Sequence, residues 1–389
     1  MKTNLIYILG MMCLSGTVSA QTTVNYTEFE QKVLDYSQTL KQSVSQRTAM
    51  QKAMKAAKTA FFPAVDATGS YQYRINKYDM DFGGMAVPME HDSYSAEVGV
   101  VQPIYAGGSI YHTYKASQIQ SQIADKSVDL TTDNLIYAAE ASYWGTAAQK
   151  EMYKTMCQYV EIISQLTKVL QDKYDDGYIS KTDLIQMQTR LKEAELQRSS
   201  SYQSYQIALQ NMNVLMGLEP DKEVGLVDSI FVELPLPAYV GADAALNVRP
   251  DYAISQLDVD YQKRQVKLAA AKYNPSLSIG FKETWGTQML NISGETMFNS
   301  NVYASVKLPL FHWGARFKST AAQKAILLGK QYALQDKQDQ ITKEVAKAWT
   351  SLTENTRQID IAKENCKLAE ENLDLNTFSY TEGRLTILD

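Results

Sequence analysis

The pattern of hydrophobic and polar residues changes its period at two places, near Pro103 and near Pro309, which lie 309 − 103 = 206 positions apart. Residues 65–75 alternate between apolar and polar side chains, and residues 93–105 return with the same period of two, which predicts a pair of strands. Beyond its first two residues, the stretch 107–172 has no proline and almost no glycine. Such a run is helical or disordered, and we expect one long helix.

The same order returns in the second half of the chain. Strands are expected at about 276–286 and 299–311, although Glu283 interrupts the alternation, and a long helix follows at about 314–378. Helical spacing also precedes the first hairpin, over residues 26–60. We therefore predict an α+β fold built from two tandem repeats of helix, β-hairpin and long helix.

Each change of period is marked by a proline and by glycine. The first contains Pro103, Gly107 and Gly108, and the second contains Pro309 and Gly314. Proline cannot donate a hydrogen bond to a sheet and so suits a strand end, whereas glycine gives the backbone freedom to turn into a helix. We interpret these residues as the junctions between strands and long helices.

A return helix is expected over residues 181–216, antiparallel to the first long helix. Its residues at alternating spacings of three and four are mostly apolar, which is typical of a coiled-coil seam. These positions are Leu184, Met187, Leu191, Ala194, Arg198, Ser201, Tyr205, Ala208, Met212 and Leu215. The first helix of about 65 residues would be roughly 100 Å long at 1.5 Å per residue.

The N-terminus has the order of an export signal, with Lys2, a short apolar stretch, and the small residues Val18, Ser19 and Ala20 before a cleavage point. A buried N-terminal helix is the alternative. The expected division is therefore a signal peptide at 1–20, a first repeat at 21–217, a proline-containing intermediate segment at 218–247, and a second repeat at 248–389.

Composition narrows the function. The 389 residues are 45% hydrophobic with a net charge of −5, which argues against a nucleic-acid partner because such proteins usually carry a basic face. Three histidines and three cysteines show no metal-ligand spacing, so we expect no metal and no cofactor. No nucleophile–base pairing or phosphate loop indicates an enzyme. Cys157 and Cys366 are expected as free thiols, with a disulfide as the alternative.

The four predicted strands match tilted membrane-spanning strands of about 11 residues with one lipid-facing side. A half-buried strand of a soluble sheet alternates in the same way. A membrane tolerates no unpaired sheet edge, and known bacterial barrels have at least eight strands. Spanning strands would therefore require two chains, giving eight strands, or three chains, giving twelve.

The order of these features resembles the TolC-like outer-membrane efflux proteins. The motifs that carry the resemblance are Gln102-Pro103-Ile104-Tyr105-Ala106-Gly107-Gly108, Tyr174-x-x-Gly177-x-x-Ser180-x-x-Asp183 and Leu215-Met216-Gly217, followed by a second copy of the plan. The resemblance implies a homotrimer in outer-membrane lipid, with a twelve-stranded barrel continuous with a long periplasmic α-helical coiled-coil barrel. It also implies an exit duct that docks with a periplasmic adaptor and an inner-membrane pump.

The resemblance places the periplasmic entrance, its gate or pore constriction, at the helical tips. Tyr380 to Asp389 aligns with Tyr174 to Asp183 at the same offset of 206. Asp183, Tyr380 and Asp389 then fall on positions that line or latch the entrance, and Arg384 lies one position from a common latch arginine. The alternative is that the two acids only start helices, where negative charge is favourable.

Asp389 stands where the second return helix would begin, and we expect the reading frame to continue beyond it. The competing interpretation of the whole chain is a non-transporting, exported coiled-coil scaffold or surface protein. Such a protein would keep the long helices but would not need two hairpins, each with one apolar face.

Overall fold

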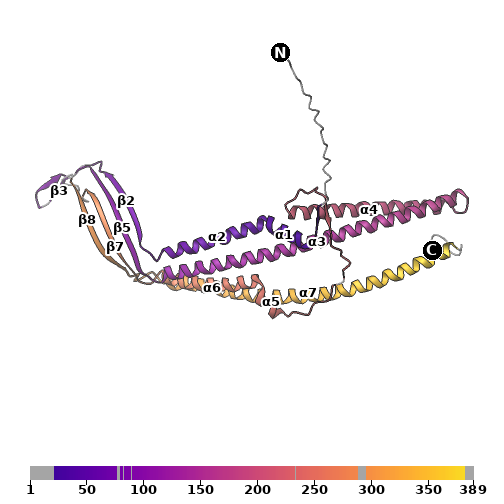
Figure 1. The fold of residues 1–389 in the computed structure, drawn as a ribbon. Helices are drawn as coiled ribbons and strands as arrows, with labels where there is room; N and C mark the ends of the chain where they lie inside the picture. Colours follow the sequence, from indigo (N-terminus) through magenta and orange to yellow (C-terminus); the bar gives the residue numbers. More distant parts are fainter. Residues whose placement is uncertain are drawn as a thin grey trace, which may run out of the picture. The chain divides into compact units, whose positions relative to one another are not determined.

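The computed structural model describes residues 22–76, 79–81, 83–88, 90–232, 234–287 and 295–381 (Figure 1). The expected signal peptide lies outside these residues. The chain divides into two compact units. The first unit comprises Met1–Gln38, Asp133–Pro235 and Glu371–Asp389, and the second comprises Thr39–Thr132 and Leu236–Glu370.

The second unit contains an antiparallel sheet of four strands in the order β2-β5-β7-β8 (Figure 1). These strands are β2 (Ala64–Tyr73), β5 (Asp92–Ala106), β7 (Ser276–Thr287) and β8 (Thr296–Lys307). The central pairing of β5 with β7 joins the two hairpins, and β2 and β8 are the edges. A small two-stranded sheet, β3 (Asp79–Asp81) with β4 (Ala86–Pro88), lies between β2 and β5 in the sequence.

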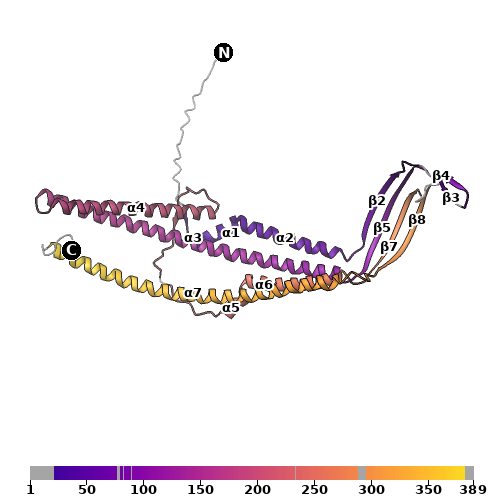
Figure 2. The same cartoon turned by 180° about the vertical axis from the view of Figure 1, so that it is seen from behind.

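Helices continue from this sheet. The first hairpin is preceded by α2 (Gln38–Thr59) and followed by α3 (Ser109–Asp175), and the second is preceded by α6 (Pro250–Ala271) and followed by α7 (Ala315–Thr381). The amide of Gln262 donates to Gln323 at 2.7 Å, and Lys330 pairs with Asp258 at 2.8 Å. These contacts hold α6 and α7 antiparallel and side by side, as Figures 1 and 2 show.

The first unit is held by an apolar core. It contains α1 (Tyr26–Tyr36), part of α3, α4 (Lys181–Leu215), and the parallel pair of β1 (Thr22–Val24) with β6 (Val224–Leu226). Its fully buried side chains include Phe29, Val33, Tyr143 and Met212. Burial of apolar surface, about 25 cal/mol per Å², is the main stabilising contribution here.

Two local features differ from expectation. The helix predicted over residues 26–60 is interrupted at Ser37, whose ψ of 116° is not helical, so that α1 and α2 are separate. The strand predicted at 299–311 is β8, which ends at Lys307 before Pro309. The intermediate segment 218–247 also contains β6 and all but the last residue of the short helix α5 (Ala242–Val248).

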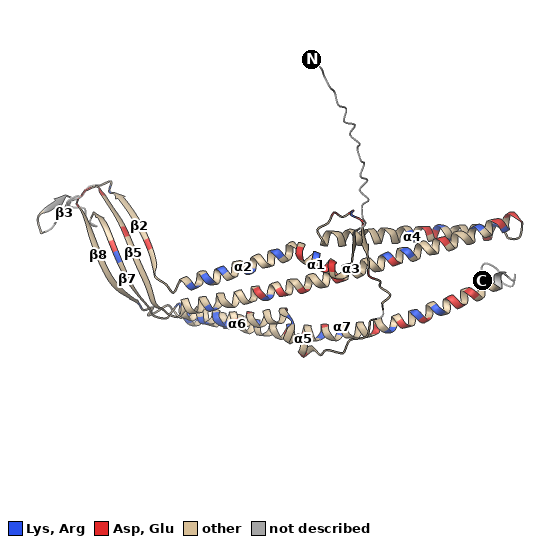
Figure 3. Ribbon diagram, in the orientation of Figure 1, with Lys and Arg blue, Asp and Glu red and all other residues tan. Residues whose placement is uncertain are grey.

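Charged residues are frequent along the helices and sparse on the four-stranded sheet, as Figure 3 shows. Among the described helices, none has both the length and the hydropathy required to cross a membrane.

Candidate functional site

The four-stranded sheet has one polar and one apolar face. Directly paired residues of an antiparallel sheet project to the same side, so the register defines rows across it. We call one side the polar face, although it also carries the apolar side chains of Val101, Met297 and Tyr303. It is formed mainly by Asp66, Thr68, Ser70, Ser95, Glu97, Gly99, Lys282, Thr284, Asn299 and Asn301. The opposite side, the apolar face, is formed by Val65, Ala67, Tyr71, Val98, Val100, Ile279, Phe281, Trp285, Val302 and Val306.

Two acids interrupt the apolar face: Asp92 at the start of β5, in the row of Tyr73, and Glu283 in the middle of β7. Glu283 projects from the apolar face, in the row of Val98 and Ser300. The Ser300 hydroxyl donates a hydrogen bond to its carboxylate. Glu283 is therefore satisfied locally by the neighbouring strand, which is how a polar group is retained on an otherwise apolar surface.

The two strand-to-helix junctions are built differently. Pro103 lies within β5, where the pairing with β7 shifts between Pro103 and Tyr105. Gly107 and Gly108 follow with φ of 63° and 88°, a left-handed conformation that glycine adopts without strain. A Cβ on Gly107 would lie 2.6 Å from the carbonyl oxygen of Ala271, and the Asn274 amide donates to Gly107 O at 2.9 Å.

The second junction has no such close approach. Pro309 lies in the segment between β8 and α7, and Gly314 has a φ of 73° with nothing within 4 Å of a Cβ built on it. Trp313 precedes it with a φ of 49°, which is uncommon for a residue with a large side chain. The sequence presented both junctions as copies of one motif, but only at the first does a glycine lie against the turn after α6. The second junction meets that turn through His312, whose ring centroid lies 5.5 Å from that of Tyr273.

His112 lies one turn into α3, beside the first junction. Burial lowers its pKa below the ordinary value of 6.5, and the positive charges of Lys267 and Arg264 on α6 lower it further. Its Nδ1 atom is buried and has no hydrogen-bond partner among the described residues. The imidazole is therefore held in its neutral form near neutral pH.

At the far end of α3, Asp183 forms a capping box at the start of α4. The Asp183 N–H donates to Ser180 Oγ at 3.2 Å, and the Ser180 N–H donates to Asp183 Oδ2 at 3.2 Å. Gly177, with a φ of 78°, closes the preceding turn. Tyr380 lies at the end of α7, whereas Arg384 and Asp389 fall outside the described residues. The capping role considered for Asp183 is thus observed directly.

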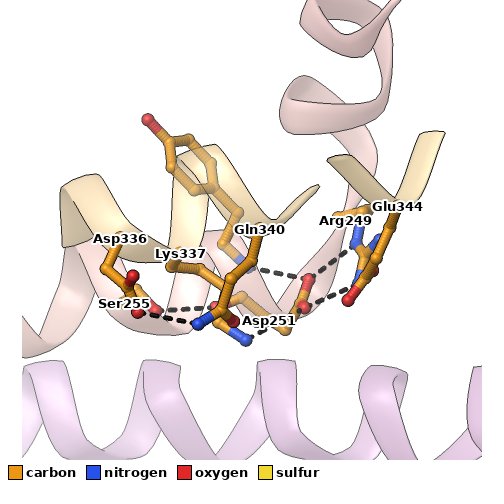
Figure 4. Close-up of polar contacts among 8 residues, drawn as sticks. Arg249, Asp251, Ser255, Asp336, Lys337, Gln340 and Glu344 are labelled. Atoms are coloured by element: carbon orange, nitrogen blue, oxygen red, sulfur yellow. Dashed lines mark hydrogen bonds and ion pairs between the residues drawn. The ribbon is translucent and has the colours of Figure 1, made fainter. Parts of the chain in front are cut away.

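A network of charged residues joins the start of α6 to α7 (Figure 4). The Arg249 guanidinium donates to both oxygens of Asp251, at 3.0 and 2.8 Å, and to Glu344 at 2.6 Å. Lys337 lies 3.6 Å from Asp251. Hydrogen bonding to Asp251 raises the pKa of Arg249. Burial alone would raise the pKa of Asp251, but the hydrogen bond and charge of Arg249 hold it below its ordinary value.

In the first unit, a second polar cluster ties the N-terminal segment to α3. The carboxylate of Asp228 accepts a hydrogen bond from the Tyr26 N–H at 2.7 Å and lies 2.8 Å from the Tyr143 hydroxyl. That hydroxyl is also 3.0 Å from Val24 O. Burial and then Asp228 raise the pKa of Tyr143, so the phenol stays protonated and acts as the donor. We call Tyr143, Asp228, Val24 and Tyr26 the clasp.

Among the described residues, no three histidine, cysteine, aspartate or glutamate side chains are grouped to hold a metal ion. Cys157 and Cys366 are free thiols.

Comparison with known proteins decides the family. Residues 30–218 and 241–389 match the sequence model of the outer membrane efflux protein family. The chain belongs to this family. The resemblance to TolC-like outer-membrane proteins is thereby confirmed, and the chain is an outer-membrane protein.

Individual relatives are distant. The chain is 21% identical over 278 residues to the alkaline protease secretion protein AprF of Pseudomonas aeruginosa, a match that spans 69% of this chain and 57% of the length of AprF. The CmeC outer membrane channel of Campylobacter jejuni superposes with a TM-score of 0.80 at 16% identity, over 94% of this chain and 78% of CmeC. The outer membrane protein VceC of Vibrio cholerae gives 0.78 at 15% identity, over 93% and 87%. At these identities the structural likeness establishes the fold.

The sequence did not indicate two residues of this efflux-family chain that join distant segments, Asp228 and Arg249. Asp228 and Arg249 are single charged residues in a proline-containing region, and nothing in their spacing indicates their distant partners. The only local signal was Pro250, which favours a helix start directly after Arg249.

Proposed function

We propose that this chain forms the outer-membrane exit duct of a tripartite efflux or type I secretion system. Three copies would close their four-stranded sheets into a twelve-stranded barrel, and their helices would continue it as a periplasmic coiled-coil tube. Substrates would pass through it passively after delivery by an inner-membrane pump through a periplasmic adaptor. The proposal joins the family membership to the geometry of one sheet.

The observation that carries the proposal is the open sheet with two edges and two unlike faces. Every residue of β2 and of β8 is exposed in the single chain. An unpaired edge cannot remain within a membrane, because its backbone N–H and C=O groups would lack partners. Pairing β2 of one copy with β8 of the next removes both edges. The apolar face then meets lipid and the polar face lines the lumen.

The helices support a tandem repeat of the two halves. The long helices α3 and α7 each contain 67 residues and start at Ser109 and Ala315, which again differ by 206. Each directly follows the second strand of a hairpin. We infer that residues 21–217 and 248–389 are two copies of one plan, with 218–247 as the segment that joins them.

The membrane assignment is tested by placing a charge on either face of one strand. Val302→Lys puts a lysine on the apolar face of β8, where Val302 is 83% exposed. Asn301→Lys puts a lysine at the neighbouring position of the same strand, which projects from the polar face. A lipid-facing lysine near the bilayer midplane costs about 2–4 kcal/mol. We expect Val302→Lys to insert poorly into planar bilayers, and Asn301→Lys and the unchanged protein to give stepwise conductance.

Equal insertion of both lysine variants would contradict the assignment of faces. If the unchanged, purified protein produced no conductance at all, the duct itself would be refuted and the coiled-coil scaffold would be favoured. Unheated electrophoresis of the same preparation reports whether three chains stay together.

We also propose that the helical tips form the gate of the duct, with Asp183, Tyr380, Arg384 and Asp389 at its constriction. Three copies of an acid around one axis would form a ring that favours cations. Asp183→Asn removes the charge, whereas Ser180→Ala weakens the capping box but keeps the carboxylate. We expect only Asp183→Asn to raise conductance. If both variants changed the conductance equally, Asp183 would act only as a helix cap and the gate role would be refuted.

A further inference from the structure

Within the four strands, three of the four charged residues of the polar face lie in two neighbouring rows. One row of the sheet runs Asp66, Gly99, Lys282, Asn301, and the next runs Thr68, Glu97, Thr284, Asn299. Within these two rows only Asp66, Glu97 and Lys282 are charged. The remaining side chains are small or neutral, so they do not neutralise these charges.

The side chain of Lys282 is directed by the residue opposite it. Its direct partner on β8 is Asn301, and its direct partner on β5 is Gly99. Gly99 has no side chain and leaves open space, since a Cβ there would meet only a backbone oxygen at 3.9 Å. Lys282 instead pairs diagonally with Glu97. The two side chains remain 40% and 31% exposed, so the pair stays in contact with the solvent above the polar face.

Asp66 completes the group. It lies in the same row as Lys282, on the far side of Gly99, and its side chain is exposed. Among the described residues none forms an ion pair with Asp66. Two acids and one base therefore leave one net negative charge per chain in these rows, −2 + 1 = −1. Within the four strands, the next charge on the polar face is Lys307, six residues along β8 from Asn301 or roughly 20 Å at 3.4 Å per residue.

We propose that Asp66, Glu97 and Lys282 form a charge belt that sets the ion preference of the duct within its membrane section. This inference rests on the proposed function, because the polar face becomes a lumen only when the sheet closes. Three copies carry a net charge of about −3, which favours cations in the way that acidic rings do in other channels. Lys282 limits this preference by neutralising Glu97.

The range of the belt depends on salt. Charges exposed to solvent are screened beyond about 10 Å at 0.1 M and beyond about 30 Å at 0.01 M ionic strength. A belt on the wall of a wide lumen therefore acts on passing ions mainly at low salt. The ion preference of the duct should strengthen as the salt concentration falls.

The test is the reversal potential of the full protein in planar bilayers under a KCl gradient at low ionic strength. Lys282→Gln changes the belt from −1 to −2 per chain, and we expect the reversal potential to move toward that of a cation-selective pore. Glu97→Gln and Asp66→Asn each bring the belt to zero, and we expect both to move it in the opposite direction.

Glu283→Gln is the matched control. It removes the same charge as Glu97→Gln from the residue next to Lys282, but on the apolar face. We expect no change in reversal potential. The double variant Glu97→Lys with Lys282→Glu keeps the ion pair and the net charge. It should therefore have the reversal potential of the unchanged protein, and it shows that the sheet tolerates substitutions at both positions.

The belt is refuted if the unchanged protein conducts but Lys282→Gln leaves its reversal potential in place, or if Glu283→Gln shifts it as much as Glu97→Gln. Either result leaves the duct standing. A protein that does not conduct refutes the duct and the belt together, so the two failures are distinguishable.

Discussion

The close approach at the first junction makes a quantitative prediction about Gly107. Alanine there must keep a φ of 63°, which costs an L-residue about 1–2 kcal/mol. Its Cβ would also stand 2.6 Å from the Ala271 carbonyl oxygen and 2.9 Å from Asn274 Cβ. A backbone oxygen cannot move aside cheaply, and overpacking of this kind costs about 1–3 kcal/mol more. We therefore expect Gly107→Ala to destabilise the protein by about 2–5 kcal/mol from the sum of these effects.

Gly314→Ala separates the two contributions. Its φ of 73° imposes the same backbone cost, but nothing lies within 4 Å of the added Cβ. Urea unfolding of the purified proteins in detergent, followed by circular dichroism, should rank unchanged protein, Gly314→Ala and Gly107→Ala in falling order of midpoint. Equal midpoints for the two variants would show that the contact between Gly107 and Ala271 does not constrain the junction.

Three further predictions concern polar groups in the helical parts. Tyr143→Phe removes the clasp hydroxyl from a partly buried carboxylate and should lower the unfolding free energy by about 1.5–3 kcal/mol, measured by urea unfolding; no loss would refute the clasp. Asp251→Asn should lower it more than Glu344→Gln, because Glu344 is 57% exposed and such pairs contribute at most about 1 kcal/mol; the reverse order in thermal melting would contradict the network. Because the pKa of His112 is lowered in the folded chain, the unfolded chain binds a proton at His112 at a higher pH than the folded chain does. The melting temperature should therefore fall as pH drops below about 6.5, and His112→Gln should make that fall smaller.

The hairpins and long helices are predictable because local periodicity encodes them. The strict alternation of apolar and polar residues before Tyr73 indicates a strand. The long stretch after Gly108 without proline and with almost no glycine indicates a helix, and both patterns can be read from neighbouring residues alone. The helix start at Asp183 was also predictable, because an acid in the first turn of a helix is favourable. These features depend on chain segments of ten to seventy residues and need no knowledge of distant partners.

Contacts between distant segments were not predictable in the same way. The pairing of Gly99 with Lys282 joins residues of different hairpins, and many registers would satisfy the same alternation. The break at Ser37 was missed because its neighbours have helical spacing on both sides. Asp228 and Arg249 acquire their roles only when segments far apart in sequence meet, and a single charged residue carries no signal of that meeting.

The clasp has a consequence for the order in which the chain can fold. Tyr26 contacts Asp228 across 202 residues, and Val24 contacts Tyr143 across 119. Contacts of such sequence separation require a large loss of chain entropy before they stabilise anything, and they slow folding. During synthesis and export, the N-terminal segment therefore cannot form these contacts until Tyr143 and Asp228 have been made. We expect the first described residues of the chain to be among the last to become fixed, and the apolar side of α1 to remain exposed until then.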